Sequence, residues 1–78
     1  MASGGMPLAM ASPGKLLTVI GINAGWGLQR RLTDMGLTPG VQIRIMNGQY
    51  ASPVLIDLRG SRLGLGRGVA QKILVKES

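Results

Sequence analysis

The chain contains no cysteine and no histidine among its 78 residues. It can therefore form neither a disulfide nor a Cys/His zinc site, the two devices that hold many small domains together. A chain of this length makes one small domain, so its stability must come from a compact, well-closed core. Because Trp26 and Tyr50 are its only aromatic residues, that core must be built from Leu, Ile, Val and Met.

The same absences exclude most enzymatic chemistry. No Ser-His-Asp or Cys-His centre is possible without histidine and cysteine. The acidic residues number three, Asp34, Asp57 and Glu77, and Glu77 is the penultimate residue. Iron(II) sites favour histidine together with carboxylates. We therefore predict a protein that is not an enzyme and has no cofactor and no metal site, and the alternative of a metal-sensing domain is a minor one.

The basic excess predicts attraction to polyanions. Nine Lys and Arg residues stand against three acidic ones, giving a formal net charge of +6. Anionic lipid surfaces and nucleic acid phosphates both attract such a surface. A small basic barrel that binds RNA or DNA is thus one reading. The scarcity of stacking aromatic residues argues against it, so nucleic acid is the less favoured partner.

Five short segments are predicted as β-strands. They are rich in β-branched residues or alternate apolar with polar residues, and turn residues separate them. They span 15–22, 41–46, 54–59, 62–65 and 72–75, with a hairpin loop at Gly60-Ser61 and a short connection at 66–70 that suits one 3₁₀ turn. Five closely spaced strands favour a small closed barrel, since closure removes free sheet edges.

One helix is predicted, over residues 26–35. Leu28, Leu32 and Met35 recur at i, i+4 and i+7, which places them on one face, toward the core. Asp34 follows Arg30 at i+4, a spacing at which the two charges contribute a few tenths of a kcal/mol. Gly36 suits the residue after the helix end, where φ is often positive.

The organisation is a flexible N-terminal arm, residues 1–6, followed by one folded domain, residues 7–76. The first 14 residues carry no Lys or Arg, unlike a secretory signal. No stretch approaches the ~20 apolar residues of a membrane span. These features predict a cytoplasmic protein.

The stretch Arg31-Leu32-Thr33-Asp34-Met35-Gly36-Leu37-Thr38-Pro39-Gly40 resembles the R-L-x-[DE]-[ML]-G-[LI]-x-[PE]-G block of the FeoA family, the ferrous iron transport proteins A. The resemblance extends in order and spacing over about residues 7–76. Further matching positions are Pro7-Leu8, Pro13-Gly14-Lys15, Ile20, Ile22, Pro53-Val54, Arg59-Gly60, Arg62-Leu63, Ala70, Ile73 and Val75. Two departures stand out: Gly64 between the two leucines, and Gly66-Arg67-Gly68 where the family usually has polar and acidic residues.

The resemblance implies a mostly β fold, an SH3-like barrel of about five strands with one short α-helix inserted after the first strand. It also implies a partner, the ferrous iron permease (ferrous iron transport protein B), which carries a cytoplasmic GTPase domain. The chain would then be an accessory protein that modulates the assembly or GTPase-coupled transport of the permease. It would sit at the inner face of the membrane through this partner, and its basic surface would be attracted to anionic lipids.

The candidate partner-binding residues lie on the helix, on the turn after it and in one loop. Exposed side chains on such a projection suit docking, because loops on rigid scaffolds often carry recognition. Trp26 is either a partner anchor or a cover for the end of the core at the helix start. The full candidate set is Trp26, Arg30, Arg31, Asp34, Leu37 and Tyr50.

Overall fold

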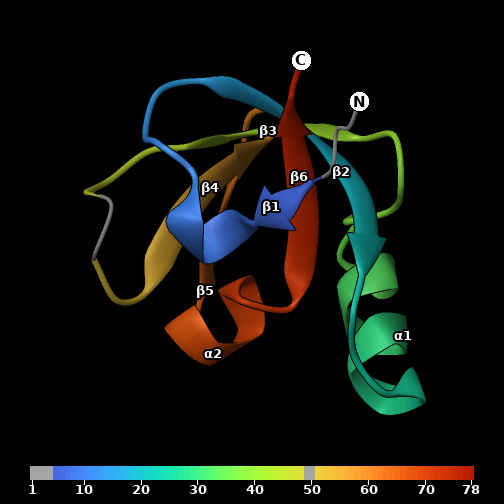
Figure 1. The fold of residues 1–78 in the computed structure, drawn as a ribbon. Coiled ribbons are helices and arrows are strands. Elements are labelled where there is room, and N and C mark those ends of the chain that lie inside the picture. Colours follow the sequence, from blue (N-terminus) through green and yellow to red (C-terminus); the bar gives the residue numbers. More distant parts are fainter. Residues whose placement is uncertain (1–4, 49–50) are drawn as a thin grey trace.

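A curled antiparallel sheet carries the fold of the computed structural model, which describes residues 5–48 and 51–78 (Figure 1). Its elements in chain order are β1 (Met6–Pro7), η1 (Leu8–Met10), β2 (Leu16–Ile22), α1 (Trp26–Asp34), β3 (Gln42–Ile45), β4 (Val54–Leu58), β5 (Ser61–Leu65), α2 (Arg67–Ala70) and β6 (Ile73–Glu77). The predicted strands and the predicted helix after the first long strand are confirmed. β1 adds a sixth strand that the sequence pattern does not reveal.

The strands are ordered β1-β6-β2-β3-β4-β5, and all neighbours are antiparallel. The long strand β2 pairs with both β3 and β6, which lets the sheet curl around one core. Among the described residues, no ladder joins β1 to β5, so the end strands are not paired with each other. The short helical segments η1 and α2 contact one another near these ends instead.

Much of the core consists of strand residues at the inward positions that the alternating pattern predicts. On β3 and the residue before it, Val41, Ile43 and Ile45 are buried while Gln42 and Arg44 are exposed. Every second residue of a strand faces the same side of the sheet, so one register decides all these burials at once. The other buried apolar residues are Leu8, Ala9, Ala11, Leu17, Val19, Leu32, Leu37, Val54, Ile56, Leu58, Leu65, Ala70, Ile73 and Val75.

The end of α1 is a Schellman motif centred on Gly36. Gly36 has φ +99°, and its N–H donates to the carbonyl of Thr33 at 2.9 Å. The N–H of Leu37 donates to the carbonyl of Leu32 at 3.0 Å. These bonds satisfy carbonyls that a helix end leaves without partners. The predicted end of the helix is therefore confirmed. The prediction of which helix residues face the core is partly wrong, because Leu32 is buried whereas Met35 is 40% exposed.

The β4–β5 hairpin turns one residue earlier than predicted. Leu58 pairs with Ser61, so the two-residue loop is Arg59-Gly60 rather than Gly60-Ser61. Both loop residues have positive φ, +53° and +87°, as a type I′ turn requires. Asp57 supports this turn, since its Oδ1 accepts a hydrogen bond from the Gly60 N–H at 2.8 Å.

Replacing Asp57 with alanine is expected to lower the free energy of unfolding by about 1 kcal/mol, the usual net worth of one hydrogen bond. Urea unfolding followed by circular dichroism measures the change. Asp34→Ala is the matched control, because Asp34 is exposed and has no side-chain hydrogen bond or ion pair in the described structure. Equal effects of the two substitutions would contradict the role given to the Asp57 carboxylate.

Two further boundaries differ from expectation. Met6, which the sequence pattern assigns to the N-terminal arm, pairs with Val75 as part of β1 and packs against the core. Residues 1–4 of that arm lie outside the described part of the chain. The connection after β5 contains one turn of α-helix, Arg67–Ala70, where the sequence suggests a 3₁₀ turn.

Candidate partner-binding surface

The outward face of α1 presents an exposed aromatic ring with an arginine over it. Trp26 is the first residue of α1 and is 74% exposed. The guanidinium carbon of Arg30 lies 5.3 Å from the centroid of the indole ring, within the range of a cation–π interaction. With Gln29 and Thr33 these residues line a shallow depression. The indole of Trp26 is therefore exposed and does not cover the end of the core. This leaves the interpretation of Trp26 as a partner anchor.

Gln29 fixes this helix start relative to β2. Its side-chain Nε2 donates to the carbonyl of Ile22 at 3.1 Å and to that of Ala24 at 3.0 Å. The helix has no side-chain N-cap, because the preceding residue is Gly25. The two hydrogen bonds from Gln29 fix the segment between β2 and α1. The first turn of α1, which carries Trp26, is thus held in place relative to β2.

Arg31 and Asp34 are exposed as predicted, but they do not join Trp26 and Arg30 in one cluster. Arg31 lines a separate depression with Leu28 of α1, with Met35 just after the helix, and with residues 64–66 and 69. Asp34 makes no ion pair with Arg30; within residues 5–48 and 51–78 the ion pair found is Lys15–Glu77. The expected i, i+4 contact is replaced by the stacking of Arg30 on Trp26.

Leu37 was expected to be a surface contact, and this expectation is wrong. Its exposed fraction is 0%, and it belongs to the core cluster. The reason is the Schellman motif, in which the residue after the glycine folds back against the helix and packs near the residue five positions earlier, here Leu32. Tyr50, the remaining candidate, lies outside the described residues.

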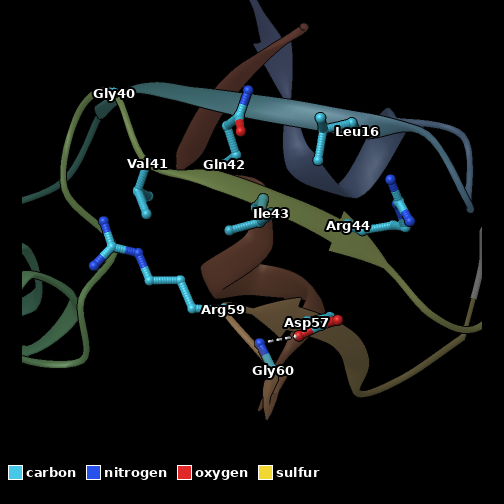
Figure 2. Close-up of a pocket in the computed structure, with 9 residues that line it drawn as sticks. All are labelled: Leu16, Gly40, Val41, Gln42, Ile43, Arg44, Asp57, Arg59 and Gly60. Carbon is cyan, nitrogen blue, oxygen red and sulfur yellow. Dashed lines mark hydrogen bonds between the residues drawn. The ribbon is translucent and has the colours of Figure 1, made fainter.

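A second surface feature is a hollow of about 380 Å³ between β3 and the β4–β5 turn (Figure 2). Its lining residues are Leu16, Gly40, Val41, Gln42, Ile43, Arg44, Asp57, Arg59 and Gly60. Figure 2 shows the side chain of Arg59 extending along the side near Val41, with Arg44 on the opposite side. The volume lies at the lower end of the range of about 300–1,000 Å³ that small-molecule pockets occupy.

Sequence reasoning missed this hollow because it depends on where β4 stops pairing with β3. The outward position of Arg44 follows from alternation, but the same pattern predicts that Arg59 ends a strand, whereas it lies in the turn. One signal was present: glycine is common at the second position of a type I′ loop, and Gly60 can take that position when the loop is Arg59-Gly60. Placing the loop at Arg59-Gly60 would have set Arg59 beside the end of β3.

No group of three or more carboxylate, histidine or cysteine side chains that could hold a metal ion occurs in the described part of the chain. Asp34 is the last residue of α1, and Asp57 lies on β4, so the two carboxylates belong to different elements. No helix within the described ranges is long and apolar enough to cross a membrane.

Fold and surface together define a small SH3-like barrel protein that displays an aromatic–arginine pair on its inserted helix. The FeoA domain profile matches residues 6–77. The chain therefore belongs to the FeoA family, as the resemblance of its residues implied.

Individual relatives agree with this assignment. The chain is 39% identical over 72 residues to "Putative Fe(2+) transport protein A" of Methanocaldococcus jannaschii, covering 92% of this chain and 87% of the relative. The crystal structure of an "Iron Uptake Regulatory Protein (FeoA)" is similar with a TM-score of 0.83 at 30% identity, covering 95% and 97% of the two chains. IdeR of T. acidophilum, with a TM-score of 0.85 at 18% identity and 36% of its own length covered, shares the fold alone.

Proposed function

We propose that this chain is a non-enzymatic accessory protein of bacterial ferrous iron uptake. In this proposal it works in the cytoplasm, binds the cytoplasmic side of the ferrous iron permease and modulates the permease's assembly or GTPase-coupled transport. Membership of the FeoA family and the name of the relative from Methanocaldococcus jannaschii support a role in Fe(2+) transport. Fe(2+) is the cargo of the permease in this account, and the chain itself does not need to hold it.

The observation that carries the binding role is the exposure of Trp26. Tryptophan and arginine are the residues most enriched at binding hot spots, and here they stand in contact on one helix face. A ring that is 74% exposed leaves most of its apolar area in water, and burying apolar area is favourable by about 25 cal/mol per Å². A partner that covers the ring therefore gains affinity without rearranging the barrel.

The arginines beside the ring favour an acidic face on the partner. Arg30 and Arg31 are both exposed, and neither forms an ion pair in the described structure. Electrostatic complementarity of this kind raises association rates and fixes the orientation of docking. The same field attracts the protein to the anionic inner surface of the membrane, where about 1 kcal/mol is gained per nearby Lys or Arg.

Charge reversal at both positions, Arg30→Glu with Arg31→Glu, is expected to leave the fold intact and to weaken capture of the permease. The cost in stability is about 1 kcal/mol or less, since an exposed cation–π contact is worth no more than this. A pull-down with the full-length permease, and with its isolated cytoplasmic domain, measures capture, and circular dichroism checks the fold. Lys72→Glu with Lys76→Glu is the control, because it makes the same change in net charge at residues outside α1.

Undiminished capture by the α1 variant would contradict docking through this helix. Equal weakening by the control pair would show that overall charge, rather than this surface, drives the association. Binding of an oligonucleotide that survives ~200 mM salt would favour the nucleic acid reading instead, because charge attraction alone weakens steeply with salt.

A further inference from the structure

We propose that the hollow between β3 and the β4–β5 turn binds an extended acidic segment of a partner protein. The segment would pair with the main chain of Gln42 and place a carboxylate between Arg44 and Arg59. This site lies apart from the Trp26–Arg30 pair, and the inference does not depend on the identity of the partner proposed above.

The main chain of Gln42 faces away from β2. Thr18 of β2 stands opposite Gln42, and the neighbouring Val19 N–H donates to the carbonyl of Val41 at 2.9 Å. In an antiparallel pair, residues that exchange hydrogen bonds alternate with residues that do not. Thr18 and Gln42 are therefore a non-bonded pair, and the N–H and C=O of Gln42 point toward the β4 side of β3.

On that side β4 does not reach them. The ladder between β3 and β4 ends at Arg44 opposite Asp57, and the chain then turns at Arg59-Gly60 instead of continuing along β3. Within the described residues, the N–H and C=O of Gln42 have no hydrogen-bond partner. An open main-chain donor and acceptor on one strand residue is what an extended peptide uses when it adds to a sheet.

The charges around this position favour a carboxylate. Arg44 and Arg59 are exposed on the two sides of the hollow, and the single acidic group lining it is Asp57. One oxygen of that carboxylate already accepts the Gly60 N–H at 2.8 Å. Two arginines thus line the hollow together with one carboxylate that is already engaged. A guanidinium forms its strongest hydrogen bonds with carboxylate or phosphate oxygens.

A peptide fits these groups better than a nucleic acid does. Phosphate oxygens could accept from the arginines and from the N–H of Gln42, but they offer nothing to the Gln42 carbonyl, which needs a donor. A peptide main chain supplies an N–H and a C=O together. The residues that line the hollow also include no aromatic ring, and single-stranded nucleic acid binding depends on such rings for base stacking.

The test is a titration of the ¹⁵N-labelled full chain with an acetylated, amidated hexapeptide of alternating valine and glutamate. We expect saturable shifts centred on the Gln42 and Arg44 amides at peptide concentrations up to ~1 mM, the weak end of specific binding. The matching peptide of valine and glutamine should bind about tenfold more weakly, because it lacks the charge-assisted hydrogen bonds. A thymidine hexanucleotide and sodium acetate form the comparison arms.

Variants of the chain distinguish binding in the hollow from general electrostatic attraction to the basic protein. Arg59→Gly suits the positive φ of the turn and should weaken peptide binding about tenfold, as should Arg44→Gln. Lys72→Gln removes one positive charge at an exposed residue that does not line the hollow, and it should leave binding unchanged. The proposal is overturned if no shifts occur by ~1 mM, if the shifts centre elsewhere, if Lys72→Gln weakens binding as much as Arg59→Gly, or if the hexanucleotide or acetate binds the hollow as tightly as the acidic peptide.

Discussion

Replacing Leu37 with alanine is expected to lower the free energy of unfolding by about 2–5 kcal/mol, the range for leucine truncations in a packed core. Leu37 is fully buried and packs within the core cluster. Removing most of its side chain both loses apolar burial and leaves a cavity. For a domain of this size each kcal/mol corresponds to a shift in melting temperature of about 4–8 °C, so calorimetry resolves the effect easily.

Trp26→Ala is the matched comparison for this variant. It removes a larger apolar side chain, but from a position that is 74% exposed, and its cost should stay near the ±0.5 kcal/mol typical of surface substitutions. The cation–π contact with Arg30 adds no more than about 1 kcal/mol to that cost. If Leu37→Ala lowered the free energy of unfolding no more than Trp26→Ala does, the assignment of Leu37 to the core would be wrong.

Replacing Gly36 with valine is expected to cost about 3 kcal/mol or more. A non-glycine residue held in the left-handed region costs of order 1–3 kcal/mol, and a β-branched side chain tolerates this region least. The backbone of Gly36 has φ +99°, and a Cβ built there would lie 3.1 Å from Cδ2 of the buried Leu58. Steric crowding against the core therefore adds to the backbone strain.

Gly66→Val is the control for Gly36→Val. Gly66 precedes α2 with φ −59°, which any residue adopts, and no atom beyond its two neighbours in the chain lies within 4 Å of the position that a Cβ would take. Thermal unfolding should show a large loss for Gly36→Val and a small change for Gly66→Val. Equal melting temperatures of Gly36→Val and the unmodified chain would mean that α1 ends without the left-handed residue that the structure shows.

The sequence allowed the regular elements to be predicted, because one face of each is buried. Strict alternation on Val41, Ile43 and Ile45 leaves a single register that hides all three. Gly36 marks the helix end because glycine readily adopts the positive φ that the residue after a helix end often requires. The family was likewise identified from the block around this glycine, and the domain match over residues 6–77 confirms it.

The predictions failed where contacts between distant parts of the chain, rather than local sequence, determine the structure. Met6 and Pro7 form a strand only because β6 is there to pair with them, and two residues carry no periodicity. Leu37 follows the helix end, so helical spacing does not describe which way its side chain faces. The hollow beside Gln42 depends on β4 leaving β3, and nothing in the alternating pattern of either strand shows where their pairing stops.

The central claim is that the exposed Trp26–Arg30 surface docks on the ferrous iron permease. The most direct measurement is calorimetric titration of the full-length permease in lipid nanodiscs with the unmodified chain and with Trp26→Ala. The account predicts binding by the unmodified chain with a Kd below ~100 μM and at least ~30-fold weaker binding by the variant, the loss expected at a hot spot. Absence of binding by the unmodified chain, or equal affinities for the two proteins, would contradict it.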